Sequence, residues 1–296
     1  MSKNATERRH ESAIGLDQLE PAAALRLLAE GQQAAAHVVT DAVPSIAAAA
    51  ELTANALRQG GRLIYVGAGS SGLMAMADAL ELPGTYGIAQ DRIVVLMAGG
   101  MASLTDLAGG PEDDTVLAEK DAAVITAGDC VICVSASGST PYSLTIAKIA
   151  RSRQAKVIGM ANNAGAPLFA VADVSVLLAT PPEVVAGSTR MGAGTAQKIA
   201  FNMLSTLTAI KLGHVHDGHM VDVRADNEKL RQRATRIVSE IAGIDMNAAD
   251  ERMKSADGSV KIAVLLAAGA KDAEAAQAAL ARSKQVLRQA LAEFER

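Results

Sequence analysis

Short apolar runs alternate with helical patterns through the middle of the chain. Runs of strand length lie at 62–67, 92–97, 129–135, 156–160 and 173–178. Between them, apolar positions repeat with helical spacing at 70–80, 101–108, 112–120 and 141–153, and a short apolar segment lies at 167–171. Apolar strands that alternate with helices are typical of a parallel sheet covered by helices on both faces. We therefore predict an α/β fold whose ligands bind beyond the carboxyl ends of the strands.

Helical patterns also precede and follow this central region. They lie at 17–30, 31–41 and 45–58 before it, and at 190–212, 223–241, 247–255, 259–268, 272–282 and 284–295 after it. Residues 1–15 lack such a repeat and are predicted to be loose. We predict three parts, namely an N-terminal helical segment (1–44), the sheet domain (45–236) and a small all-helical C-terminal domain (237–296).

The first strand leads into a glycine and serine turn, GAGSSG, at 67–72. Glycines let the backbone approach a ligand closely, and the first N–H groups of the following helix favour an anion. The letters also fit the dinucleotide fingerprint GxGxxG, which needs an acidic residue after the next strand. Asp91 precedes that strand, and Gly99 and Gly100 follow it. A dinucleotide site is therefore disfavoured.

A second turn repeats this arrangement. The strand DCVICV at 129–134 leads into SASGSTP at 135–141, and a helical pattern follows. The hydroxyl side chains of the two turns are Ser70, Ser71, Ser135, Ser137, Ser139 and Thr140. Without any Lys or Arg beside them, they indicate a phosphate monoester held by neutral donors. The alternative is that they are ordinary helix caps.

Composition narrows the classes of protein. The chain has 296 residues, 50% hydrophobic and only 2% aromatic, so its core must be aliphatic. The net charge of −4 and the lack of a basic face argue against a nucleic acid partner. No apolar run reaches the roughly 18 residues of a membrane span. The charged N-terminus lacks the apolar core of a signal peptide, so we predict a cytoplasmic protein with no membrane contact.

Cysteine and histidine residues could suggest a metal. Cys130 and Cys133 fall on opposite faces of one predicted strand, so buried core thiols are expected rather than a metal or redox site. The other candidates are the histidines of GHVHDGHM, namely His214, His216 and His219. They lie in a predicted loop without an acidic cluster, and we predict solvated or interface histidines and no metal.

Two carboxylates lie at positions where an ordinary surface charge is not expected. Glu81 lies between Leu80 and Leu82, and Glu112 follows Pro111 shortly after the second strand. Each is a candidate acid or base. For Glu112 the alternative is an ordinary helix start.

Several longer motifs together resemble one family. They are the glycine-serine loop, ELPGTYG, the AGG…EDD segment, SASGSTPY, EVVAGSTRMGAGTAQK (183–198), NMLST (202–206) and MVDV…NEKL (220–230). From about residue 45 to 230 the chain resembles the N-acetylmuramic acid 6-phosphate etherases, which are lyases of the sugar isomerase (SIS) fold. The resemblance implies an SIS-type parallel sheet flanked by helices.

This resemblance also implies an activity. Such an enzyme of cell-wall sugar recycling cleaves the lactyl ether of N-acetylmuramic acid 6-phosphate, giving N-acetylglucosamine 6-phosphate and D-lactate. By resemblance, Glu81 is the acid/base glutamate and Glu112 a second essential glutamate, while the six hydroxyl residues bind the substrate phosphate. In the open sugar the C2 proton is acidic, so a carboxylate can remove it before the C3 ether leaves and water adds. No metal or other cofactor is required.

Glu81 follows Ser70 by eleven residues, which is about 16 Å along a continuous helix. That distance is too long for one hexose phosphate. Either the helix bends early or a second subunit completes the site, and we predict a homodimer with shared sites.

Some positions depart from the family pattern, where polar or cationic residues are usual. They are Leu73, Leu80, Ser139 and Gly192. These departures leave two alternatives open. One is an SIS-fold isomerase that returns the C2 proton at C1, and the other is a non-catalytic sensor of a different phosphosugar, as in the related glucokinase regulatory protein.

Overall fold

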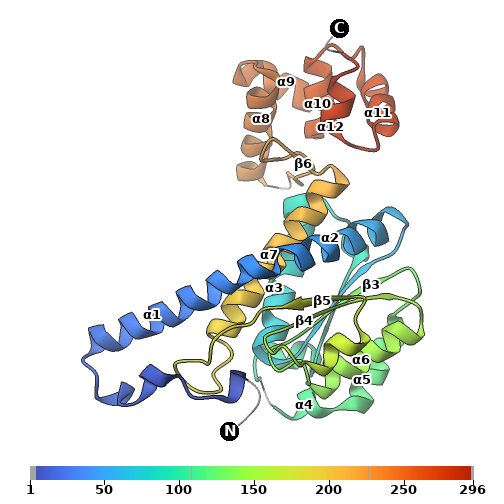
Figure 1. Ribbon diagram of the computed structural model, residues 1–296. Coiled ribbons are helices and arrows are strands. Elements are labelled where there is room, and N and C mark those ends of the chain that lie inside the picture. The colour runs from blue at the N-terminus through green and yellow to red at the C-terminus, as the bar shows by residue number, and fades with distance from the viewer. Residues whose placement is uncertain (1–4, 108, 226, 295–296) are drawn as a thin grey trace. The chain divides into compact units, whose positions relative to one another are not determined.

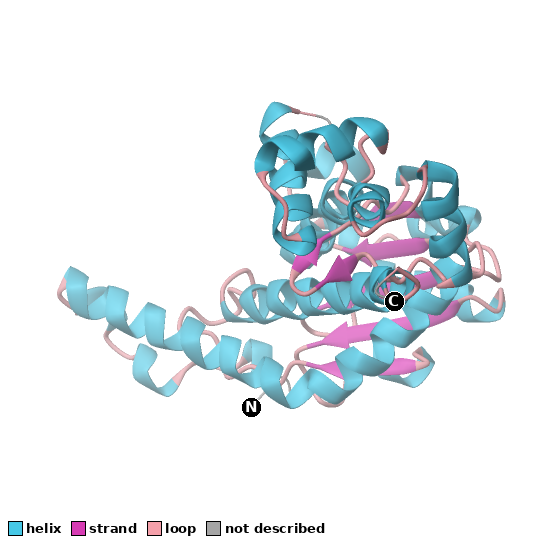
Figure 2. Cartoon of the chain, turned by 90° about the horizontal axis from the view of Figure 1, so that it is seen from above, coloured by secondary structure: helices cyan, strands magenta, loops and turns pink. Residues whose placement is uncertain are grey.

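A parallel sheet forms the centre of the protein. The computed structural model describes residues 5–107, 109–225 and 227–294. The sheet has five strands in the order β2-β1-β3-β4-β5 (Figures 1 and 2). Their bounds are β1 Leu63–Gly67, β2 Ile93–Met97, β3 Cys130–Ser135, β4 Lys156–Ala161 and β5 Val174–Leu177. Every neighbouring pair is parallel, so the predicted α/β fold is confirmed.

The strand order places the two serine turns at the same point. The chain passes from β1 to β2 on one side and then crosses to β3 on the other, so β1 and β3 are neighbours. This is the switch point at which open parallel sheets bind ligands. The serine turns follow β1 and β3, at the carboxyl ends of these two strands.

The helices that precede, connect and follow the strands lie near most of the predicted positions, but their number and bounds differ. They are α1 Pro21–His37, α2 Val43–Arg58, α3 Gly69–Tyr86, α4 Gly110–Asp113, α5 Thr115–Asp121, α6 Pro141–Ser152 and α7 Gly192–Leu212. The predicted break at residue 30 is wrong, because α1 continues through Gly31. For the helix predicted at 70–80, the end at residue 80 is also wrong, because α3 includes Pro83 and ends at Tyr86.

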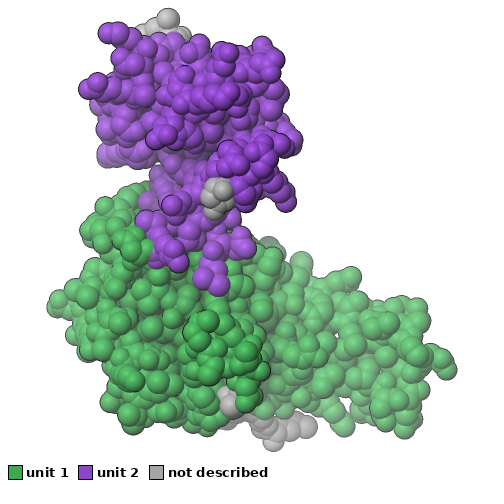
Figure 3. All heavy atoms as spheres, turned by 180° about the vertical axis from the view of Figure 1, so that it is seen from behind, with its two compact units in different colours: residues 1–79, 91–205 green, residues 80–90, 206–296 purple. Residues whose placement is uncertain are grey.

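The chain divides into two compact units (Figure 3). Residues 1–79 and 91–205 make up the first, and residues 80–90 and 206–296 the second. The second contains the hairpin of β6 Val215–His216 and β7 His219–Met220 and the helices α8 Glu228–Ala242, α9 Met246–Ser255, α10 Val260–Ala267, α11 Ala273–Arg282 and α12 Leu287–Leu291. The predicted boundaries after residues 44 and 236 lie inside α2 and α8, and the three-domain division stays a prediction.

The core of the first unit is largely aliphatic, as the composition predicts, and it also contains Tyr65, Tyr142 and Phe201. Cys130 and Cys133 are fully buried free thiols in β3. Burial raises the pKa of Cys130 to about 12 and raises that of Cys133 as well. Thiols that stay protonated are poor ligands and nucleophiles, so these cysteines belong to the core, as predicted. Among the described residues, no helix has the length and apolar character needed to cross a membrane.

A buried carboxylate that the sequence analysis did not single out joins β1, α3 and α7. Asp78 accepts hydrogen bonds from Tyr65 Oη at 3.0 Å, Asn202 Nδ2 at 2.9 Å and Ser205 Oγ at 2.9 Å. Burial raises its pKa, although these bonds oppose the shift. Hydrogen bonds from two other elements of the first unit, β1 and α7, thus hold the helix that begins at the first serine turn.

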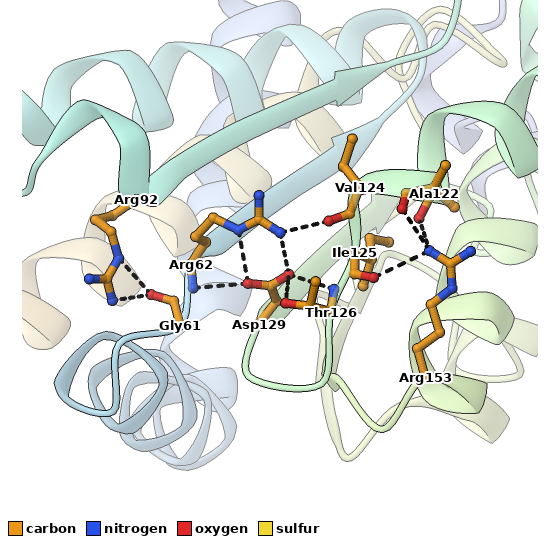
Figure 4. A network of polar contacts seen from close by, with 10 residues as sticks. Gly61, Arg62, Arg92, Ala122, Val124, Ile125, Thr126, Asp129 and Arg153 are labelled. Carbon is orange, nitrogen blue, oxygen red and sulfur yellow. Dashed lines mark hydrogen bonds and ion pairs between the residues drawn. The ribbon is translucent and has the colours of Figure 1, made fainter.

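An ion pair closes the opposite, amino-terminal edge of the sheet (Figure 4). Arg62, just before β1, donates from Nη2 to Asp129 Oδ2 at 2.7 Å and from Nε to Oδ1 at 3.1 Å. Thr126 N also donates to Oδ2, at 2.8 Å. Burial raises the pKa of Asp129, but the hydrogen bonds from Arg62 and Thr126 outweigh it, and the pKa is lowered overall.

We expect Asp129→Asn to reduce the free energy of unfolding by about 3 kcal/mol at neutral pH, because it leaves Arg62 without its buried partner. A lowered native pKa stabilises the fold above the unfolded-state pKa of about 3.9. The stabilisation falls as the pH drops through the native pKa, so the difference between variant and wild type should shrink in acid. Urea unfolding at several pH values measures it.

The matched control is Asp250→Asn, which removes an exposed ion pair to Lys254 on one helix. An exposed pair contributes about 0–1 kcal/mol. Equal losses in the two variants would contradict the role given to Asp129.

Candidate active site

The two serine turns meet in one pocket of about 190 Å³ in the first unit. Its lining comes from five parts of the chain, namely Thr6, Glu7, Ala68, Ser70, Ser71, Glu112, Ser135, Ala136, Ser137, Thr140, Gly187 and Thr189. Most of the predicted hydroxyl residues and Glu112 are therefore brought together. Ser139 is exposed and lies outside this lining. The role of each as a ligand of phosphate stays a prediction.

The first turn requires its glycines because backbone and side-chain groups of the protein approach closely. A Cβ on Gly67 would lie 2.7 Å from Gly72 Cα. Gly69 has φ +52°, and a Cβ there would lie 2.7 Å from Glu112 Oε1. Side chains at these positions would push apart the end of β1 and the start of α3, or displace the carboxylate. The turn therefore places Ser70, Ser71 and Glu112 around one space.

The second turn is ordered by its own hydroxyl groups. Ser135 Oγ lies 2.7 Å from Thr140 Oγ1 and 3.2 Å from Ser137 Oγ, and it accepts a hydrogen bond from Gly138 N at 3.0 Å. Ser139 donates from N and Oγ to Ser137 Oγ, at 3.1 and 3.0 Å. The turn precedes α6, whose first residue is Pro141. Neutral donors at a helix start make a cradle suited to an anion.

Of the two carboxylates in this lining, Glu7 is exposed, and Glu112 is the predicted acid or base. It is partly buried in the short helix α4. Burial raises its pKa, and the negative charge of Asp113 raises it further. A carboxyl group with a raised pKa is suited to carry a proton for acid catalysis.

Glu81, the other predicted acid or base, lies in the part of α3 that belongs to the second unit. It is exposed, as is the preceding Leu80, at 66%. Its assignment as acid/base residue stays a prediction.

The sequence analysis missed two other parts of the lining. Gly187 and Thr189 lie in the run 183–198, whose motif was a usable signal. Thr6 and Glu7 lie in the segment predicted to be loose, and no periodic pattern marked them. That prediction is wrong for Thr6, which is 3% exposed.

The departure at Gly192 has a local explanation. Glu183, 6% exposed, accepts hydrogen bonds from the first two N–H groups of α7, Gly192 N at 2.9 Å and Ala193 N at 2.8 Å. A Cβ at Gly192 would lie 3.0 Å from Glu183 Oε2 and 3.1 Å from Ala35 Cβ. Glycine thus lets a buried carboxylate cap the helix.

The three histidines lie in the second unit, at or within the β6–β7 hairpin rather than in the predicted loop. His214 Nδ1 lies 2.5 Å from the carbonyl oxygen of Tyr86, and Nε2 lies 3.9 Å from Asp222 Oδ2. Burial lowers the pKa of His214, although Asp222 opposes the shift. Within the described ranges, no group of three or more His, Cys, Asp or Glu residues is placed to hold a metal ion.

Comparisons with known proteins agree with this fold. Residues 26–162 match the SIS domain family. A solved structure from Bacteroides fragilis, assigned as a phosphosugar isomerase involved in capsule formation, matches with a TM-score of 0.51 and 22% identity. The match covers 68% of this chain and 97% of that one, and it shows the fold.

Two curated relatives cover nearly the whole chain. The N-acetylmuramic acid 6-phosphate etherase of Deinococcus radiodurans is 44% identical over 92% of this chain and 90% of its own length. That of Halalkalibacterium halodurans is 38% identical over 99% of both. The chain therefore belongs to the N-acetylmuramic acid 6-phosphate etherase family.

Proposed function

We propose that this protein is a carbon–oxygen lyase that cleaves the lactyl ether of N-acetylmuramic acid 6-phosphate. The products are N-acetylglucosamine 6-phosphate and D-lactate. The observation that carries the proposal is the single pocket that gathers hydroxyl groups from both turns and the partly buried Glu112. Relatives named as etherases over nearly the full length support the substrate.

The proposed mechanism uses side chains alone. Ser70, Ser71, Ser135 and Thr140 donate to the phosphate and fix the sugar in place. A carboxylate removes the C2 proton of the open sugar, and the C3–O bond then breaks. Glu112, with its raised pKa, donates the proton to the departing lactate oxygen. Glu81, which by family resemblance is the acid/base residue, is the proposed base at C2, and water then adds at C3.

Lactate release is the direct test of the proposal. Purified protein should release D-lactate from N-acetylmuramic acid 6-phosphate, followed with a D-lactate dehydrogenase. Unphosphorylated N-acetylmuramic acid is the matched control and should react far more slowly. Binding of the phosphosugar without lactate release would favour the sensor or the isomerase.

We also propose that the protein acts as a homodimer with shared sites. Helix α1 is 17 residues long, but only Ala35 is buried in it. It extends away from the sheet in Figures 1 and 2. Leu19 and Leu25 near its start are 41% and 66% exposed. A helix normally buries its apolar side, so a second copy is the proposed cover. A cytoplasmic location stays a prediction.

Replacement of Leu25 by glutamate should weaken this dimer about tenfold, because a charge would enter an apolar contact. Sedimentation velocity at a series of concentrations measures the dissociation constant. Val116→Glu, at an exposed site on α5, is the control and should leave the constant unchanged. A monomeric wild type with full activity would overturn the shared-site proposal.

Gly69→Ala should lower kcat about tenfold or more, because its Cβ would occupy the space of Glu112 Oε1 and shift that carboxylate. The positive φ adds a stability loss of about 1 kcal/mol. Gly84→Ala on the same helix is the control, since a Cβ there meets open space. Unchanged kcat in Gly69→Ala would show that this position of the Glu112 carboxylate is not needed.

A further inference from the structure

A buried asparagine ties the N-terminal segment to the pocket. Asn163, two residues after β4, is 6% exposed. Its Oδ1 accepts a hydrogen bond from Ala5 N at 2.9 Å. Its Nδ2 donates to Thr6 Oγ1 at 3.1 Å and to the carbonyl oxygen of Ala136 at 3.2 Å. One amide group, 157 residues after Thr6, thus joins the N-terminal segment to the second serine turn.

The hydroxyl group of Thr6 acts as a hydrogen-bond acceptor within the protein. Its Oγ1 accepts the bond from Asn163, so its own proton is available to donate. Thr6 is 3% exposed and lines the same pocket as Ser70, Ser135 and Thr140. A buried hydroxyl group with an unused proton costs free energy unless an acceptor is supplied. An oxyanion bound in the pocket would supply that acceptor.

We infer that Thr6 is a further phosphate-binding residue and that Asn163 positions it. The inference rests on the proposed function, since it names an additional donor for the same phosphosugar. It assigns a binding role to the segment 5–7, which comes far from both serine turns in sequence. The rival interpretation is that this segment plugs the pocket and must leave before a ligand enters.

The test compares dissociation constants for N-acetylglucosamine 6-phosphate by titration calorimetry. Thr6→Val removes the donor at nearly constant shape and should weaken binding about tenfold, as expected for a hydrogen bond to a charged group. Thr6→Ser retains the hydroxyl group and should bind nearly as the wild type does. Ser12→Ala changes a hydroxyl group nearby in the sequence but outside this pocket and is the control.

A double variant tests the positioning role of Asn163. Asn163→Ala alone should weaken binding, because Thr6 loses its anchor. Adding Thr6→Val to Asn163→Ala should then change little, although the same substitution is costly in the wild type. Thermal unfolding of each variant separates loss of binding from loss of fold. In the lactate assay, Asn163→Ala should raise KM more than it lowers kcat.

Three results would overturn the inference. They are unchanged binding in Thr6→Val, tighter binding in Thr6→Val as expected for a plug, and equal losses from Thr6→Val with and without Asn163. The proposed function is tested separately, because it fails only if the wild type releases no lactate. The calorimetric comparison remains decisive in that case, since it needs only phosphosugar binding.

Discussion

Glu112→Gln is expected to lower kcat for D-lactate release by about a thousandfold. Glutamine keeps the shape of the side chain but cannot donate a proton to the departing lactate oxygen. The serine and threonine donors remain, so KM should change little. Steady-state kinetics measure both constants. A variant that keeps even a tenth of the wild-type kcat would exclude Glu112 as the acid.

The pH dependence of the activity is a second test of Glu112 as the acid. Burial and the neighbouring charge of Asp113 raise the pKa of Glu112, so the required proton is kept to a higher pH than usual. Activity should fall as the pH rises through this pKa, and Glu112→Gln should lose that limb. Asp113→Asn is the matched control. It should remain active, with the limb moved to lower pH, because removing a like charge lowers the pKa of Glu112.

Mixing two inactive variants is expected to restore activity. In the proposed homodimer, one subunit supplies Glu81 and the other supplies Glu112 to each site. Glu81→Gln and Glu112→Gln should each be inactive alone. A random mixture of their subunits contains about half mixed dimers, each with one intact site of two, so about a quarter of the wild-type activity should return.

The alternative arrangement predicts a different result. If each site takes both glutamates from one subunit, every site in a mixed dimer lacks one of them and no activity returns. Mixing must include a step that exchanges subunits, such as dilution below the dissociation constant followed by concentration. Two wild-type preparations mixed in the same way control for losses during the exchange.

Local sequence patterns predicted the sheet and much of the pocket well. Apolar, β-branched runs mark buried strands, and alternating helices require parallel pairing, which brings the carboxyl ends of β1 and β3 together. The serines follow these ends directly, so position along the chain was enough to bring them together, while Glu112 comes after β2. Helix ends were predicted less well. The helix predicted to end at residue 80 continues through Pro83 to Tyr86.

Long-range contacts could not be predicted in this way. Thr6 and Asn163 are ordinary polar residues in the sequence, and only their hydrogen bond across 157 residues places Thr6 in the pocket. Asp78 follows an unremarkable helical pattern, but tertiary packing surrounds it with Tyr65, Asn202 and Ser205.

The sequence alone determined the fold class, the two serine turns and the family, because periodicity and motifs are properties of neighbouring residues. Only the tertiary structure decided which distant groups share the pocket and which carboxylates are buried. Burial depends on what surrounds a side chain in space, and it is the main cause of the raised pKa of Glu112. The hydrogen bond from Asn163 to Thr6 likewise joins residues that are far apart in the sequence.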